Sequence, residues 1–130
     1  MSRPILVDSC WYITTMRQGQ DPLQALADLA EDRDVAICGV VKCEVGRGIR
    51  EPKRLARFQE AWEVMLYVDS SFALWERTLA LAWNLGRQGI VLPLPDLHIA
   101  ACAEKIGAVI LTHDRHFNQI PGIDATDRIF

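Results

Sequence analysis

Four acidic residues lie at or shortly after the ends of apolar runs in this chain, and together their carboxylates could bind a divalent metal ion. They are Asp8, Glu44, Asp96 and Asp114. If the apolar runs form strands of a parallel sheet, their carboxyl ends share one edge, where open α/β sheets bind ligands. Two carboxylates about 4 Å apart repel each other by roughly 4 kcal/mol at an effective dielectric of about 20. A cluster of four therefore predicts bound cations, and such a site favours phosphodiester hydrolysis.

Each of these acids also has a structural interpretation that needs no metal ion. Asp8 and Asp96 could cap the helices that follow them, and Asp114 could form a turn. Glu44 could pair with Arg47 on a helix surface, which would add only a few tenths of a kcal/mol. We favour the metal interpretation for Glu44, because on a helix it falls between two valines on the side expected to face the core. An unpaired carboxylate is costly to bury there.

Strand-like and helical patterns alternate along the chain, which predicts an α/β domain with a mainly parallel sheet and helices on its faces. Strands are expected at residues 5–7, 35–38 and 109–112, a strand or extended segment at 64–68, and a short edge strand at 128–130. The apolar run 90–95 ends at Asp96. Helices are expected to begin near residues 9, 21, 40, 51, 70 and 96. Asp21 followed by Pro22 predicts an N-cap and a first helical residue, and Gly107 predicts a helix end.

The composition is that of one ordinary globular domain in the cytoplasm. The chain has 130 residues, of which 50% are hydrophobic and 24% are charged. No apolar stretch is as long as a membrane span, and the start of the chain lacks the long apolar region of a secretory signal. Four cysteines lie in apolar settings without a CxxC pair, which fits buried thiols in a reducing compartment better than a zinc framework. The net charge is −3; the four candidate ligands contribute −4, which leaves +1 for the rest.

Four segments of the sequence resemble the motifs of the PIN-domain nucleases, and in particular the VapC-type toxins of prokaryotic toxin–antitoxin pairs. These segments are residues 5–9, 40–48, 95–103 and 111–117, and they span nearly the whole chain in family order. The resemblance implies a single PIN domain over residues 1–130, with a sheet of four to five strands between helical layers. It also implies a Mg²⁺- or Mn²⁺-dependent ribonuclease, a homodimer and a cognate antitoxin whose basic residue reaches the acidic pocket.

The resemblance also assigns roles to residues of the site. The four acids match the acidic positions of the family, and Ser9 and Thr112 match hydroxyl positions beside them. We expect Asp8, Asp96 and Asp114 to be the main metal ligands, while Glu44 either binds metal or orients a metal-bound water. We expect the hydroxyls of Ser9 and Thr112 to hold these groups or to contact substrate.

One position departs from the family pattern. Many relatives carry an acid two positions after the fourth carboxylate, where this chain has His116. Because of this departure, the sequence does not decide whether a second metal site is fully occupied. The histidine also favours Mn²⁺, because imidazole suits softer ions better than it suits Mg²⁺. His116 is otherwise expected to hold a ligand or to contact substrate. The spacing of His113 and His116 leaves a zinc site as a further alternative.

Basic residues that could bind RNA are concentrated between positions 42 and 57, a segment with six positively charged and two negatively charged side chains. They are Lys42, Arg47, Arg50, Lys53, Arg54 and Arg57, and Arg115 lies in the last motif. Phosphate binding by such a patch would depend on salt. The alternative is that these side chains form a solvated helix face.

The helix expected at residues 70–88 carries more apolar surface than a single core contact needs. One stripe contains Phe72, Trp75, Leu79, Ala82 and Trp83, and an adjacent stripe contains Leu74, Leu81 and Leu85. A helix packed on two sides within the monomer, a homodimer seam and a groove for a partner's amphipathic segment all remain open.

Four functions are consistent with these patterns, and they belong to different classes. The first is a ribonuclease toxin with an antitoxin, and the second is a PIN ribonuclease of RNA maturation without one. The third is a catalytically silent interaction module, which the four intact acids argue against. The fourth is an aspartyl phosphotransfer domain, which ranks low because no second aspartate follows Asp8 within two positions.

Overall fold

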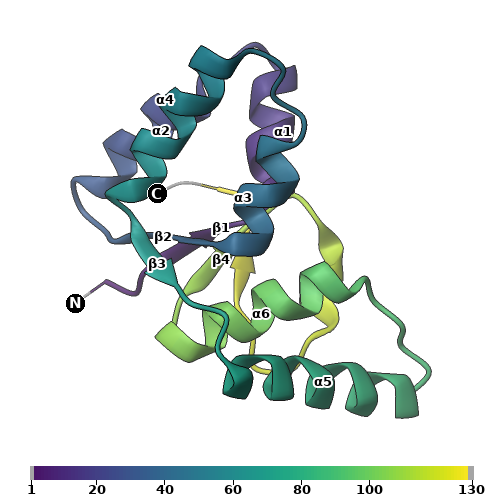
Figure 1. Ribbon diagram of the computed structural model, residues 1–130. Helices are drawn as coiled ribbons and strands as arrows, with labels where there is room; N and C mark the ends of the chain where they lie inside the picture. The colour runs from purple at the N-terminus through teal and green to yellow at the C-terminus, as the bar shows by residue number, and fades with distance from the viewer. Residues whose placement is uncertain (1, 129–130) are drawn as a thin grey trace.

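The computed structural model describes residues 2–128 as a five-stranded parallel sheet between two layers of helices (Figure 1). The strands are β1 (Ile5–Val7), β2 (Val35–Cys38), β3 (Leu66–Val68), β4 (Val109–Leu111) and β5 (Ala125–Thr126). The strand order is β3-β2-β1-β4-β5, and every neighbouring pair is parallel. The predicted α/β class with a parallel sheet is therefore confirmed.

Six helices and one 3₁₀ helix connect the strands. They are α1 (Ser9–Arg17), α2 (Pro22–Ala30), α3 (Gly39–Gly46), α4 (Pro52–Glu63), α5 (Phe72–Arg87), α6 (Leu94–Ile106) and η1 (Arg115–Gln119). The chain steps from β1 to β2 to β3 through α1–α4, and then returns across the sheet through α5 and α6. Right-handed crossovers therefore place α1–α4 on one face and α5 and α6 on the other, as Figure 1 shows.

The order of the strands reverses between β1 and β4, and this reversal creates the crevice that the site uses. Two crossovers leave β1 in one direction, and the next returns to β4 on its other side. In open α/β sheets the loops after the strands diverge at such a point, so ligands bind there. The residues that follow β1 and β4 are Asp8 and the segment leading to Asp114.

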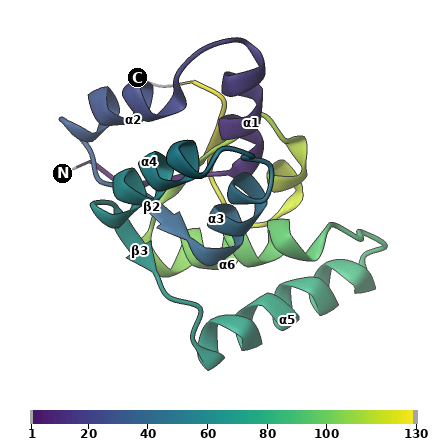
Figure 2. The same ribbon diagram turned by 45° about the horizontal axis from the view of Figure 1, so that its top comes forward.

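The core lies on both faces of the central strands. All residues of β1 and β2 are buried, which explains why these strands are continuous apolar runs rather than alternating ones. On the α1–α4 face, Tyr12, Phe58 and Trp62 pack together, and the indole of Trp62 donates a hydrogen bond of 3.2 Å to the hydroxyl of Tyr12. On the other face α6 lies between the sheet and α5 (Figure 2), and residues 97–103 of α6 are all buried.

The start of α2 and the end of α6 were predicted correctly from local capping residues. Asp21 caps α2 by accepting a hydrogen bond from the amide of Leu23, and Pro22 is the first helical residue. Gly107 ends α6 with φ +66°, a left-handed conformation that glycine adopts without a steric penalty. In the part of the chain that the structure describes, no helix is both long and apolar enough to cross a membrane.

Several boundary predictions were wrong. Residues 90–93 form no strand, and α6 begins at Leu94 because Pro95 fits the first turn of a helix. Asp96 therefore lies in the first turn of α6 and is not its N-cap, which is Pro93. His98, a polar residue of α6, is buried and only 1% exposed.

β3 and β5 form the two edges of the sheet, and β3 is shorter than predicted. β3 begins at Leu66, because Val64 still forms the C-cap of α4. β5 lies at Ala125–Thr126, and the edge strand predicted at residues 128–130 falls mostly on residues 129–130, which are outside the described part of the chain.

Candidate metal centre at the carboxyl edge of the sheet

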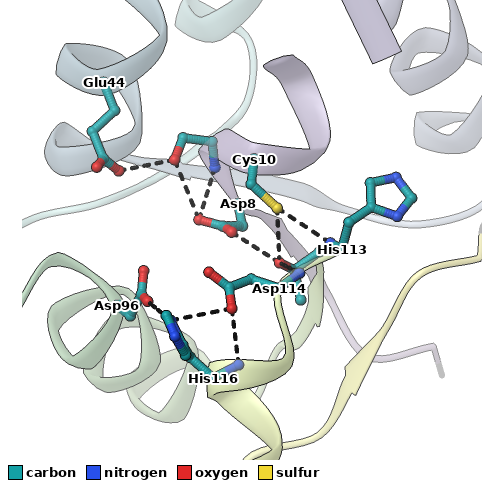
Figure 3. Close-up of polar contacts among 9 residues, drawn as sticks. Asp8, Cys10, Glu44, Asp96, His113, Asp114 and His116 are labelled. Atoms are coloured by element: carbon teal, nitrogen blue, oxygen red, sulfur yellow. Dashed lines mark hydrogen bonds and ion pairs between the residues drawn. The ribbon is translucent and has the colours of Figure 1, made fainter. Parts of the chain in front are cut away.

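The structure brings the four predicted acids to the crevice between β1 and β4, and Figure 3 shows their arrangement. Asp8 directly follows β1, and Asp114 caps η1 after β4. Asp96 projects from the first turn of α6, and Glu44 projects from α3. Sequence positions 8, 44, 96 and 114 thus meet because parallel strands and the helices after them share one edge of the sheet.

Asp8 is the most enclosed of the acids, with 2% of its surface exposed. Its Oδ1 accepts a 2.8 Å hydrogen bond from the amide of Ser9, and its Oδ2 accepts one of 2.8 Å from the hydroxyl of Thr112. The Thr112 oxygen in turn accepts a 2.9 Å hydrogen bond from the amide of Asp114. Thr112 therefore fixes the Asp8 carboxylate and the start of the Asp114 loop at once.

Glu44 is joined to Asp8 through Ser9. The Ser9 hydroxyl lies 2.9 Å from Oε1 of Glu44 and 3.4 Å from Oδ1 of Asp8, and it donates to the nearer oxygen. Among residues 2–128 no ion pair forms between Glu44 and Arg47. The surface-pair interpretation of Glu44 is therefore wrong, and this carboxylate is held at the rim of the acidic crevice.

Asp96, Asp114 and His116 form the tightest group of potential ligands. Nδ1 of His116 lies 2.7 Å from Oδ2 of Asp96 and 3.1 Å from Oδ1 of Asp114. One ligand atom from each of the three residues lies within 4.8 Å of the others. The amide of His116 also donates a 2.9 Å hydrogen bond to Oδ1 of Asp114, which fixes the first turn of η1.

The electrostatics of this group show that the acids repel one another. Burial raises the pKa of Asp96, the hydrogen bond from His116 opposes that shift, and the carboxylates of Asp114 and Asp8 raise the pKa further. The hydrogen bond to Asp96 raises the pKa of His116, with Asp114 adding to the effect. The shift favours the protonated form of His116, whose charge is opposite to that of the neighbouring acids.

The donor set fits a hard divalent cation. The carboxylates of Asp8, Asp96 and Asp114 lie around one crevice in Figure 3, and ligand oxygens of Asp96 and Asp114 come within 4.8 Å of each other. Oxygen is the donor that Mg²⁺ and Mn²⁺ prefer. The zinc alternative, in which His113 and His116 bind one ion, is wrong for this conformation. The ring of His113 points away from the acids in Figure 3, and this residue is exposed.

The residues expected to contact RNA divide into two groups. Arg115 lines a polar hollow of about 420 Å³ together with Thr112 and Asp114, so it adjoins the acidic crevice. Four others lie at the far end of α3 and the start of α4: Arg47, Arg50, Lys53 and Arg54. Arg47 follows Glu44 by three residues at the end of α3, so this group begins on the Glu44 side of the acidic crevice and extends from there into α4.

Sequence reasoning missed the role of Cys10, which it had counted only as a buried thiol. The Cys10 sulfur lies 3.4 Å from the hydroxyl oxygen of Thr112 and accepts a 3.3 Å hydrogen bond from the amide of His113. Burial raises the pKa of the Cys10 thiol, which keeps it neutral. Its place one residue after Ser9, in the first turn of α1, was the available signal.

Comparison with protein-family models identifies the class of protein that this fold and site define. The model described as PIN domain matches residues 5–123, and the chain belongs to the PIN-domain family. The family membership that the four motifs predicted is confirmed. No curated protein matches the chain significantly.

Solved structures share the fold over nearly the whole chain. A DNA-bound VapBC complex from Salmonella typhimurium matches with a TM-score of 0.79 and 23% identity, covering 96% of this chain and 98% of that one. VapBC2 from Rickettsia felis, bound to a promoter DNA fragment, matches with a TM-score of 0.73 and 20% identity, covering 95% and 97%. VapC20 from Mycobacterium tuberculosis, a toxin that cleaves the sarcin–ricin loop, matches with a TM-score of 0.61 and 17% identity, covering 85% and 90%.

Proposed function

We propose that this chain is a metal-dependent endoribonuclease that acts as the toxin of a toxin–antitoxin pair in the cytoplasm. The observation that carries the proposal is the convergence of Asp8, Asp96 and Asp114 at the strand reversal of a PIN domain. The similar solved structures support it, because several are toxin–antitoxin complexes and one is a toxin that cleaves the sarcin–ricin loop. A PIN ribonuclease of RNA maturation remains the second candidate.

The contacts in the crevice support different roles for these side chains in hydrolysis. Asp8, Asp96 and Asp114 would hold Mg²⁺ or Mn²⁺, while Ser9 and Thr112 keep the Asp8 carboxylate aimed into the crevice. When bound, such an ion polarises a phosphoryl oxygen and lowers the pKa of a coordinated water. Glu44, held by Ser9 at the rim, would orient a water or bind metal directly.

Growth of a bacterial host that expresses the chain separates the two candidates. We expect induction of the wild type to arrest growth and produce discrete RNA fragments, and co-expression of a small neighbouring reading frame to restore growth. The Asp96→Asn variant should allow growth at the same protein level. Discrete cleavage without arrest, in the absence of a protein that suppresses it, would instead favour the maturation nuclease.

We also propose that basic residues at the end of α3 and the start of α4 bind the RNA backbone. Arg50 and Lys53 are exposed, and Lys53 and Arg54 line a groove of about 540 Å³. Removing both charges in Arg50→Ala/Lys53→Ala should weaken single-stranded RNA binding, and the slope of log K against log salt should fall by about 1.4. Fluorescence anisotropy of a catalytically inactive background measures this effect, with exposed Lys105→Ala on α6 as the control. An unchanged slope would contradict a role for these residues.

The apolar surface of α5 supports a homodimer. Leu74, Thr78, Leu81 and Leu85 are buried within the monomer, so one stripe of α5 packs against its own core. The other stripe stays exposed, at 69% for Phe72, 50% for Trp75, 60% for Leu79 and 57% for Trp83. Exposed apolar patches of this kind often mark interaction surfaces.

A charge in the middle of this stripe should therefore prevent the dimer. We expect Leu79→Lys to reduce the mass of the particle by half in light scattering, because a lysine ammonium is costly to bury without a partner. Val64→Lys is the matched control, since Val64 is an apolar side chain that is 88% exposed on another part of the surface. A wild-type chain that is monomeric at high concentration would contradict the proposal.

A further inference from the structure

The imidazole of His116 lies between two of the acids that we propose as metal ligands. Its Nδ1 lies between carboxylates from two separate elements, 2.7 Å from Oδ2 of Asp96 on α6 and 3.1 Å from Oδ1 of Asp114 at the start of η1. Neighbouring ligands of an octahedral ion with bonds of 2.0–2.1 Å lie roughly 3 Å apart. Nδ1 is thus separated from each of the two carboxylate oxygens by about the distance between adjacent ligands.

The backbone holds the imidazole in this place. The amide of His116 donates to Oδ1 of Asp114, and the amide of Asp114 donates to the hydroxyl of Thr112, so the turn that carries the ring is fixed to β4 and to Asp8. The ring needs no reorganisation of η1 to remain between the two acids. His113, three residues earlier, has no such contacts through its ring and points away in Figure 3.

The chemistry of the donor determines which ion such a site prefers. Imidazole nitrogen suits Mn²⁺ and the later first-row metals, whereas Mg²⁺ takes oxygen ligands almost exclusively. One nitrogen among carboxylate oxygens therefore shifts the selectivity of the site toward Mn²⁺. An acidic residue at the same position would shift it back toward Mg²⁺.

We propose that Nδ1 of His116 is a direct metal ligand, together with Asp96 and Asp114, and that this nitrogen makes the site selective for Mn²⁺ over Mg²⁺. The inference rests on the metal-dependent function proposed above and specifies its ligand set. The alternative is that His116 only donates hydrogen bonds to the two carboxylates and positions them.

Pulsed electron paramagnetic resonance of Mn²⁺ bound to the full chain distinguishes a ligand from a positioning residue. We expect the wild type to show a ¹⁴N coupling of a directly bound imidazole. His116→Asp and His116→Ala should lose this coupling, and the matched control His113→Ala should keep it. Circular dichroism of each variant confirms that the chain is folded.

Titration calorimetry with Mn²⁺ and with Mg²⁺ gives a second readout that needs no RNA. We expect His116→Ala to bind Mn²⁺ at least about tenfold more weakly, since even residues that only support a ligand change metal affinity by roughly 10–100-fold. His116→Asp should reduce the preference for Mn²⁺ over Mg²⁺ by a similar factor, while His113→Ala should change neither value.

The possible failures are distinguishable. Mn²⁺ that binds in a manner dependent on Asp96 but shows no ¹⁴N coupling in the wild type would overturn the role of His116 and leave the proposed metal centre intact. A ¹⁴N coupling that survives in His116→Asp would also overturn it. A wild-type chain that binds neither ion would overturn both the inference and the metal-dependent function.

Discussion

Asp96→Asn is expected to reduce RNA cleavage by about 10³-fold or more, without lowering the melting temperature of the metal-free chain. The loss follows from the role of Asp96, whose carboxylate faces Asp8 and Asp114 in the crevice and would carry charge to the cation. The fold should tolerate the change, because burial and the neighbouring acids raise the pKa of Asp96 and so make its charge unfavourable there. The asparagine oxygen can still accept the hydrogen bond from His116.

This combination of effects separates a functional acid from a structural one. The control is Asp28→Asn, which removes a charge from an exposed position on α2 and should leave both cleavage and melting temperature unchanged. Cleavage rates come from gel analysis of labelled RNA, and melting temperatures come from circular dichroism. An Asp96→Asn chain that cuts RNA at the wild-type rate would remove Asp96 from the mechanism.

Phe58→Ala is expected to lower the free energy of unfolding by about 3–5 kcal/mol, the range for truncating a buried aromatic ring. Phe58 is 1% exposed, and its ring centroid lies 5.6 Å from that of Trp62 and 6.4 Å from that of Tyr12. The substitution leaves a cavity under α4, and the hydrogen bond between Trp62 and Tyr12 limits how far the site can collapse.

Urea denaturation measures this cost. The comparison is Val91→Ala, at an apolar residue that is 88% exposed, which should change the free energy of unfolding by less than about 0.5 kcal/mol. A loss below about 1 kcal/mol for Phe58→Ala would mean that the aromatic cluster is not a central part of the core. Since α4 carries basic residues of the proposed RNA surface, the same variant should also weaken RNA binding at temperatures near its melting point.

The features of the fold that depend on local signals could be predicted from the sequence. Asp21 and Pro22 define the start of α2 because a side-chain cap and a fixed φ angle act within one turn. The fully apolar runs at β1 and β2 predicted buried parallel strands for a similar reason. The common location of the four acids then followed from the geometry of parallel strands rather than from any single residue.

The remaining features depend on contacts between distant parts of the chain, which periodicity does not encode. The run 90–95 reads as a strand by composition, yet it has no partner in the sheet and passes into α6 at Leu94. His98 reads as polar, but its ring stacks on Trp75 and both nitrogens lie within 2.9 Å of the hydroxyls of Ser70 and Thr78. These partners come from α5 and the loop before it. Only the folded chain therefore shows that both ring nitrogens of His98 have hydrogen-bond partners.

The site was predicted in its composition but not in its connections. Thr112 bonds to Asp8 across 104 residues, and Ser9 bonds to Glu44 across 35. The sequence placed His116 near the acids because of its motif, but its position between Asp96 and Asp114 depends on how η1 docks against α6. Which side-chain atoms lie close together in the crevice therefore depends on tertiary contacts. The presence of four carboxylates at one edge follows from the topology of the sheet.

The most direct test of a metal-dependent ribonuclease centre is cleavage of labelled total RNA by the purified chain, freed of any bound protein by unfolding and refolding. The reaction is run with Mn²⁺, with Mg²⁺ and with EDTA, beside Asp96→Asn. We predict discrete fragments only when a divalent ion and the wild-type carboxylate are both present. Absence of cleavage by the folded wild type with either ion, or cleavage that persists in EDTA, would contradict the account.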